Sequence, residues 1–201
     1  MPTKSDLLTK YGLSSHDDDS KPRDGAQTSH DAGRGLYIVG RNIDAKRAWW
    51  HCNQGSLQRV SEGIYVQTDL TIEQQRKLLH DHAIRIALFI KPDAVLCGST
   101  AYHRGVVNDT FAMATEFGAR VRHLNPGFDV ISMRTPWIHE AGAAAFQTIT
   151  VSDSMGEFPV KCFSSEMLLL ESFTNNRTRP DSTKLNPRDM SDLCEAILAK
   201  H

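Results

Sequence analysis

The stretch that decides the fold runs from Ser56 to Gly105 and reads SLQRVSEGIYVQTDLTIEQQRKLLHDHAIRIALFIKPDAVLCGSTAYHRG. It opens with two short apolar segments, Leu57–Val60 and Ile64–Gln67, separated by Ser61-Glu62-Gly63. A glycine at the end of such a short link supplies the positive φ that tight hairpins need. The sequence therefore predicts a β-hairpin with Gly63 in its turn.

A long amphipathic helix is expected directly after the hairpin. Thr71 is the candidate N-cap, and Gln74 lies three residues later, at capping-box spacing. The apolar face of this helix is formed by Leu78, Leu79, Ile84, Ile86, Ala87, Leu88 and Ile90. Lys91-Pro92 ends the helix, because a residue that precedes proline is forced out of the helical region.

The stretch closes with a short buried strand, Asp93–Leu96, and a short helix, Ala101–Arg104. Ser99 or Thr100 is expected to cap that helix, and Gly105 to end it. The Gly98-Ser99-Thr100 segment lacks the second glycine of a nucleophile elbow and the Gly-Lys pair of a phosphate-binding loop. A helix cap explains the segment fully.

Another strand and another helix precede the hairpin. Gly35–Gly40 is a short apolar strand bounded by glycines, and Asn42 or Asp44 is expected to cap a helix that continues to about Asn53. Gly55 then ends this helix. A strand, a helix and a two-stranded wing form the back half of a winged-helix module, so we assign residues 35–68 to a winged-helix-like module.

The chain after Gly105 is rich in short β segments. The expected strands are Thr110–Glu116, Arg120–His123, Asp129–Arg134, Gln147–Val151 and Phe158–Phe163. Two helices follow: Ser164 or Ser165 caps Glu166–Phe173, with Leu168, Leu169 and Leu170 in the core, and Asn186 caps Pro187–Lys200. The predicted fold class is α+β: a disordered polar tail (1–34), the small winged-helix-like N-terminal module (35–68) and a mixed α/β C-terminal domain (69–201).

The composition is ordinary for a globular protein. The 201 residues carry a formal net charge of -1, and hydrophobic and charged residues make up 40% and 23% of the chain. A protein that holds nucleic acid with its whole surface would be strongly basic, so any such site here must be a local patch. The longest apolar run is too short to span a membrane and the first residues lack a signal-peptide core, which favours the cytoplasm. The four cysteines form no CxxC pair and are expected to be free thiols.

The order of these elements resembles the AbiEi-type antitoxin family, the antitoxin halves of abortive-infection toxin–antitoxin systems. The matching residues are Arg59, Gly63, Ile64, Tyr65 and Val66 in the hairpin, and Asp93, Ala94, Val95, Leu96, Thr100, Ala101 and Gly105 after it. The serine-capped, leucine-rich helix Glu166–Phe173 is a further point of likeness. The resemblance implies a winged-helix module for operator DNA, a C-terminal domain for neutralisation, and a nucleotidyltransferase-like toxin as partner. The family's module also has two helices ahead of the DNA-reading helix, whereas only Leu7–Leu13 and a polar stretch lie upstream here.

In the family, the helix before the wing reads DNA. The residues here that are placed to meet phosphate or bases are Lys46, Arg47, His51 and Arg59. The alternative is that Trp49 and Trp50 pack in the core or an interface and that Lys46 and Arg47 are a solvated face. A second basic cluster, Arg177, Arg179, Lys184 and Arg188, is either a solvated loop or a contact to phosphate or an acidic partner.

No catalytic residue, metal site or cofactor is predicted. His80 and His82 lie two residues apart, a spacing that points them to different sides of a helix. We therefore expect a non-enzymatic antitoxin that regulates its own operator and neutralises its cognate toxin. The alternative is a protein-interaction subunit of a defence or toxin assembly that does not bind DNA, which near-neutral charge and the missing upstream helices favour. An enzyme of another type has only scattered histidines in its support.

Overall fold

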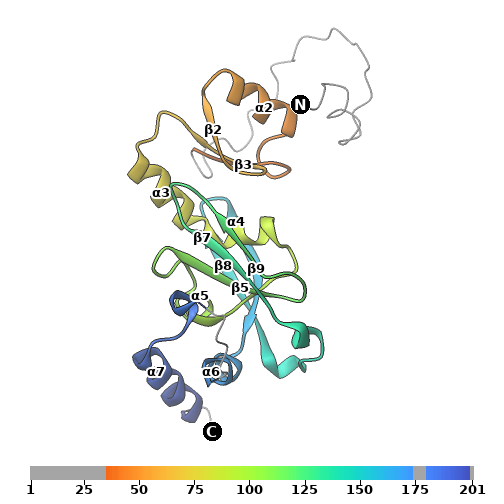
Figure 1. Ribbon diagram of the computed structural model, residues 1–201, viewed down its shortest axis with the longest axis vertical. Helices are drawn as coiled ribbons and strands as arrows, with labels where there is room; N and C mark the ends of the chain where they lie inside the picture. The colour runs from red at the N-terminus through yellow and green to blue at the C-terminus, as the bar shows by residue number, and fades with distance from the viewer. Residues whose placement is uncertain (1–34, 174–179, 200–201) are drawn as a thin grey trace. The chain divides into compact units, whose positions relative to one another are not determined.

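The computed structural model describes residues 35–173 and 180–199 (Figure 1). The predicted disordered tail 1–34 and two residues of the second basic cluster, Arg177 and Arg179, lie outside the described residues. The residues from Asp31 to His201 belong to one compact unit. Helices and strands alternate irregularly along this unit, and its larger sheet is mixed, so the predicted α+β class is confirmed.

A small three-stranded sheet opens the described chain. It contains β1 (Leu36–Ile38), β2 (Leu57–Ser61) and β3 (Ile64–Gln67) in the antiparallel order β1-β3-β2. Helix α2 (Ala45–Asn53) lies between β1 and β2 in the chain. The predicted hairpin is confirmed, with Gly63 at φ +75°. Of the two candidate caps of α2, Asp44 is correct, since its carboxylate accepts a hydrogen bond from the N–H of Arg47 at 2.8 Å.

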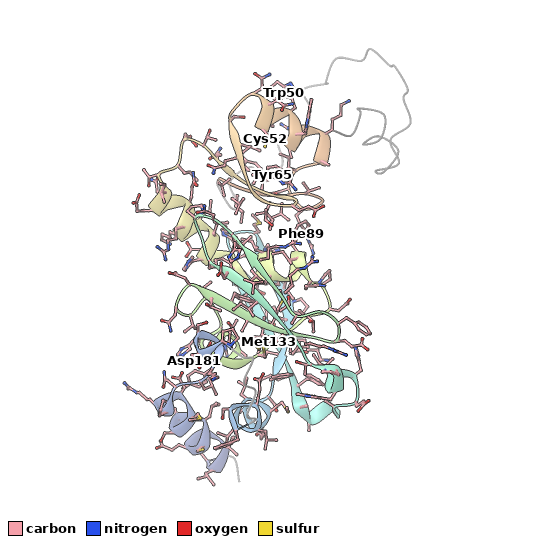
Figure 2. All side chains as sticks on the ribbon, in the orientation of Figure 1. Trp50, Cys52, Tyr65, Phe89, Met133 and Asp181 are labelled. Atoms are coloured by element: carbon pink, nitrogen blue, oxygen red, sulfur yellow. The ribbon has the colours of Figure 1, made fainter. Side chains whose placement is uncertain are left out.

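The two faces of the small sheet have different neighbours. Leu36, Ile38, Ile64 and Val66 point to one face, are fully buried, and join the core that α3 and α4 share. The strand pairing places Tyr37, Tyr65 and Arg59 in a row on the opposite face. Arg59 acts electrostatically on the Cys52 thiol of α2, and Figure 2 shows Cys52 above Tyr65, so α2 covers this second face.

The predicted long helix is two helices, α3 (Ile72–Asp81) and α4 (Ala83–Ile90), which meet at His82. The capping box is confirmed: Thr71 accepts from the Gln74 N–H, and the Gln74 side chain accepts from the Thr71 N–H. The helix breaks because the His82 ring binds the Leu78 carbonyl at 2.9 Å, the group that would otherwise accept the His82 backbone N–H. The predicted end at Lys91-Pro92 is confirmed.

The larger sheet has six strands in the order β6-β7-β5-β4-β9-β8. The strands are β4 (Val95–Leu96), β5 (Thr110–Thr115), β6 (Arg120–His123), β7 (Asp129–Arg134), β8 (Phe146–Asp153) and β9 (Gly156–Phe163). The five strands predicted after Gly105 are all present, but β8 and β9 are longer and form one hairpin. The strand β4 is shorter than predicted and excludes the exposed Asp93.

The last three helices follow β4 in the chain. These are α5 (Gly98–His103), α6 (Ser165–Phe173) and α7 (Pro187–Leu198), with short 3₁₀ segments η1 (Pro136–His139), η2 (Ala143–Ala145) and η3 (Asp181–Thr183). The Asn186 cap of α7 and the Ser164 cap of α6 are confirmed, and Asp189 completes a capping box with Asn186. The caps predicted for α5 are wrong: Thr100 accepts the Ala112 N–H of β5, and Ser99 donates to the Ser182 carbonyl.

Two further predictions about these helices are corrected. Helix α5 ends at Arg104, which takes the left-handed conformation at φ +55°, and not at Gly105. Leu168 of α6 is buried, whereas Leu170 is 62% exposed and lies outside the core. None of the four cysteines, all of which are described, forms a disulfide, as predicted. Across the part of the chain that the structure describes, no helix has both the length and the apolar character that crossing a bilayer requires.

Candidate nucleic-acid interface

The outer side of α2 presents basic and aromatic side chains together. Lys46 and Arg47 are exposed in its first turn. The next residue, Ala48, points inward and is fully buried. Trp49 is 64% exposed and Trp50 is 53% exposed, so the interpretation of these tryptophans as core residues is wrong. Helical spacing places Trp50 next to both Lys46 and Arg47 on the surface. We call Lys46, Arg47, Trp49 and Trp50 the α2 face.

The charges of the α2 face are not neutralised by the described residues. The Lys46 ammonium and the Arg47 guanidinium form no hydrogen bond or ion pair within the described ranges. The nearest carboxylate in the chain, Asp44, is occupied as the helix cap. Residues 35–68 carry the basic residues Arg41, Lys46, Arg47 and Arg59 against the acidic residues Asp44 and Glu62. The module is therefore locally basic in a chain of net charge -1.

The other two predicted DNA contacts, His51 and Arg59, lie at the opposite end of α2. His51 Nδ1 is 3.0 Å from the Ser56 hydroxyl, and Arg59 Nε donates to the Ser61 carbonyl at 3.3 Å. Burial raises the pKa of the Cys52 thiol in the last helical turn, and the Arg59 charge partly offsets this. At about 1.5 Å of rise per residue, Cys52 is about 8 to 9 Å along the axis from Lys46 and Arg47. His51 itself is four residues from Arg47 and therefore neighbours it on the helix surface, whereas Arg59 lies on β2.

The second basic cluster has fewer unpaired charges than its sequence suggests. Lys184 Nζ lies 2.7 Å from the Asp181 carboxylate, and this hydrogen bond lowers the pKa of the exposed Asp181. Arg188 is exposed in the first turn of α7, directly before the capping residue Asp189. Lys184 is therefore engaged within the chain, whereas Arg188 is exposed and forms no hydrogen bond or ion pair with a described residue.

Sequence reasoning missed three arginines on the larger sheet. Arg120 and Arg122 alternate along β6, and Arg134 ends the neighbouring strand β7. None of the three forms a hydrogen bond or ion pair with a described residue. The Arg-Val-Arg alternation in a predicted strand is the signal that could have found two of them, because alternate strand residues share a face. We call these three residues the arginine row.

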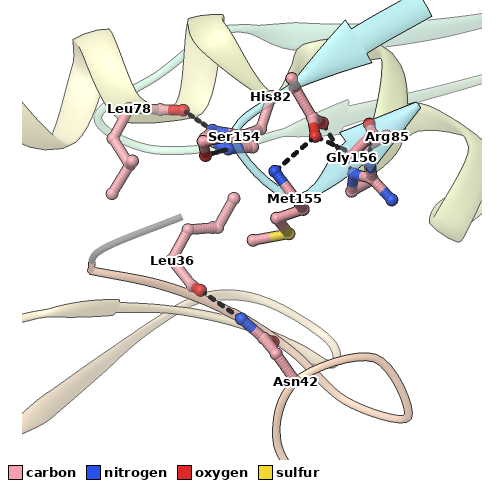
Figure 3. A network of polar contacts seen from close by, with 9 residues as sticks. Leu36, Asn42, Leu78, His82, Arg85, Ser154, Met155 and Gly156 are labelled. Carbon is pink, nitrogen blue, oxygen red and sulfur yellow. Dashed lines mark hydrogen bonds and ion pairs between the residues drawn. The ribbon is translucent and has the colours of Figure 1, made fainter. Parts of the chain in front are cut away.

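A buried polar network joins α4 to the β8–β9 hairpin (Figure 3). Arg85 donates two hydrogen bonds of 2.7 Å to Asp153 and one of 2.9 Å to the Gly156 carbonyl. Its guanidinium also lies 4.2 Å from the centre of the Phe158 ring. Burial alone would raise the pKa of Asp153, but the hydrogen bonds from Arg85 and the Met155 N–H outweigh it and hold the pKa below its usual range.

The histidines of the long helical region do not share a site. His82 is buried and binds the Leu78 carbonyl through Nδ1 and the Ser154 hydroxyl through Nε2, at 2.9 and 2.8 Å. Since a carbonyl only accepts, Nδ1 carries the proton and Nε2 accepts from Ser154 when the ring is neutral. His80 packs edge-on against Phe128 instead. No group of three or more metal-ligating side chains occurs among the described residues.

A surface hollow of about 320 Å³ lies beside the end of β5. Its charged lining includes Lys91, Lys161, Glu116 and His139, and His139 Nε2 is 2.9 Å from the Glu116 carboxylate. The exposed ring of Phe117 borders the hollow. The lining also includes Asp93, so its two lysines are matched by two carboxylates and the hollow has no excess of positive charge.

Comparison with known proteins adds no relative. The chain matches no protein-family model, and no curated protein matches it.

Proposed function

We propose that this protein is an antitoxin of a toxin–antitoxin or phage-defence system that also represses its own operator. The α2 face carries the proposal, because Lys46 and Arg47 stand exposed and unpaired among the described residues on the helix that precedes the wing-like hairpin. Cations on a helix surface of this kind meet DNA phosphates, and side chains of the same helix meet base edges.

The remaining elements support the same proposal. The strand–helix–hairpin order of residues 35–68 and the Ser164-capped α6 are features on which the resemblance to AbiEi-type antitoxins depends. A complete winged helix-turn-helix has two more helices ahead of the DNA-reading helix, and residues 1–34 lie outside the described ranges. The proposed partner is a nucleotidyltransferase-like toxin, the proposed location is the cytoplasm, and no catalytic step is assigned.

The test of operator binding is a salt series with the full chain and the duplex DNA upstream of its own gene. Arg47→Ala and Lys46→Ala are each expected to weaken binding and to lower the salt slope by about 0.9, the value for one lost phosphate contact on duplex DNA. The matched control is Lys77→Ala, an exposed lysine that pairs with Asp81 on α3. Binding that is equally tight to unrelated DNA, or unchanged in both α2 variants, contradicts the proposed autoregulation.

Neutralisation needs a separate measurement. Cells that express the cognate toxin should grow again when the wild-type chain is co-expressed. The Arg47→Ala variant should still restore growth, because neutralisation is assigned to the C-terminal domain. Failure of the wild-type chain to restore growth would contradict the antitoxin function.

One observation favours a second function, an interaction subunit of a defence assembly. Trp49 and Trp50 are adjacent and more than half exposed. Large exposed aromatic side chains are enriched at the centres of protein–protein interfaces. This function predicts that a partner protein co-purifies with the chain, that Trp50→Ala abolishes the co-purification, and that operator binding is absent at every salt concentration.

A further inference from the structure

The arginine row lies on one face of the larger sheet, at its β6 edge. Antiparallel pairing sets Arg120 opposite Ser132 and Arg122 opposite Val130. Directly paired residues and alternate residues of one strand share a face, so Arg134, two residues beyond Ser132, joins them. Adjacent members are separated by about 7 Å, which is two residues of strand rise or one diagonal step between strands.

The surroundings of the arginine row leave its charge uncompensated. Arg120 and Arg134 are exposed, Arg122 is half-buried, and none is paired within the described ranges. The carboxylate of Asp129 points to the other face of the sheet, where it binds His123 Nδ1 at 2.7 Å. Three guanidinium groups without a counter-charge among the described residues create a local positive potential that attracts anions.

An exposed aromatic residue lies close to the arginine row in the sequence. Phe117 is 71% exposed in the loop between β5 and β6, three residues before Arg120. It also borders the hollow that Lys91 and Lys161 line. Phosphate groups do not stack on an aromatic ring, whereas an unstacked base stacks on it favourably. In a duplex the bases are already stacked, so the combination of arginines and ring favours a single strand.

We propose that the arginine row and Phe117 form a binding surface for single-stranded nucleic acid. The guanidinium groups hold successive phosphates along the β6 edge, and Phe117 stacks with a base at the β5–β6 loop. Guanidinium forks recognise phosphate through paired hydrogen bonds, which is why arginine suits this role. The proposal does not rest on the antitoxin function, since it uses other residues and another form of nucleic acid.

The test is fluorescence anisotropy of the full chain with a labelled 15-nucleotide single strand of mixed sequence, made as RNA and as DNA. The same sequence as a duplex and poly-glutamate are the comparison probes. The main variant is R120Q/R122Q/R134Q, and R120K/R122K/R134K is its charge-conserving control. Far-ultraviolet circular dichroism and thermal unfolding check that each variant is folded. Lys77→Ala is the matched control, and Arg47→Ala is measured beside it.

The wild-type chain is expected to bind the single strand with a salt slope that the glutamine variant lowers by about 2, at about 0.7 per lost contact. If the two proteins bind equally at 1 M salt, the glutamine variant should bind about 100-fold more weakly than the wild-type chain at 0.1 M salt. A slope difference of about 2 over one decade of salt concentration gives this factor. The lysine variant should keep most of the slope. Phe117→Ala should weaken binding by about 5- to 150-fold without changing the slope. Lys77→Ala should leave single-strand binding unchanged, because Lys77 pairs with Asp81 outside both proposed surfaces.

Four results would overturn the proposal. They are no binding of either single strand, equal binding in the glutamine variant, tighter binding of the duplex than of the single strand, and equal binding of poly-glutamate. The duplex result would make the surface an extension of an operator contact, and the poly-glutamate result would make it a site for acidic protein. A stronger effect with RNA or with DNA would identify which single strand is the natural ligand. Because Arg47→Ala is measured on both probes, failure here and failure of operator binding are distinguishable.

Discussion

Replacing Arg85 with methionine is expected to destabilise the protein severely. The methionine keeps most of the length of the side chain but removes three hydrogen bonds, two to Asp153 and one to the Gly156 carbonyl. The Asp153 side chain is only 6% exposed, so water cannot replace the lost guanidinium. The Met155 N–H remains as a donor to the stranded carboxylate.

The magnitude follows from the burial of the pair. Removing one partner of a buried ion pair costs about 3 to 5 kcal/mol, because the other charge stays buried without compensation. For a domain of this size, each kcal/mol shifts the melting temperature by about 2 to 4 °C. Arg85→Met should therefore lower the melting temperature by about 6 to 20 °C. Replacing both residues with apolar side chains, R85M/D153L, should recover much of this loss.

The measurement is urea unfolding followed by circular dichroism, with Arg76→Met as the matched control. Arg76 pairs with Asp109 at 2.5 Å, but their side chains are 49% and 56% exposed. A surface pair of this kind contributes about 0 to 1 kcal/mol. If Arg85→Met costs no more free energy of unfolding than Arg76→Met, or if R85M/D153L is less stable than R85M, the argument from burial is wrong.

Three further predictions concern the same framework. Thr71→Ala removes the acceptor of the Gln74 N–H and should cost about 1 kcal/mol in urea unfolding, whereas Thr71→Ser should cost little. Gly63→Ala should cost more than about 1 kcal/mol, because φ is +75° and the new Cβ would lie 2.7 Å from the Phe89 ring; a neutral effect would contradict this. The folded-state pKa of Asp153 is lowered, so its stabilisation is present above its unfolded pKa of about 3.9 and is lost as pH falls through the folded value. The stability difference between the wild-type chain and Asp153→Asn should accordingly shrink in urea titrations below about pH 4.

The fold was largely predictable because its local signals are strong. The hairpin at Gly63, the capping box of Thr71 and the strand Arg120–His123 each depend on residues close together in the sequence. The break at His82 was not predictable in this way. The His82 ring that binds the Leu78 carbonyl also binds Ser154, which is 72 residues away and has no marker in the sequence. Ser99 and Thr100 resembled caps for the same reason, since their true partners lie in other elements.

The candidate sites likewise include features that local sequence predicts and features that depend on tertiary structure. The exposure of Lys46 and Arg47 follows from helical periodicity and could be predicted, but the exposure of Trp49 and Trp50 could not, because tryptophan is usually well buried. Arg134 joins the arginine row only through the register of β6 on β7. Pairing between strands is a tertiary fact, so a linear sequence shows two of the three arginines at most.

The α2 face lies on the helix that covers the small sheet, whereas the arginine row lies on the larger sheet. The two proposed binding surfaces can therefore be tested by separate substitutions. Arg85 and Asp153 fix α4 to the β8–β9 hairpin of the larger sheet, while α2 covers the far face of the small sheet. Substitution of Arg47 therefore leaves the Arg85–Asp153 pair and the arginine row untouched, and the converse also holds. If duplex binding depended on both surfaces, one ligand would span them and the two proposals would merge. If duplex binding follows Arg47 alone and single-strand binding follows Arg120 alone, the chain carries two nucleic-acid sites of different specificity, and the net charge of -1 conceals both.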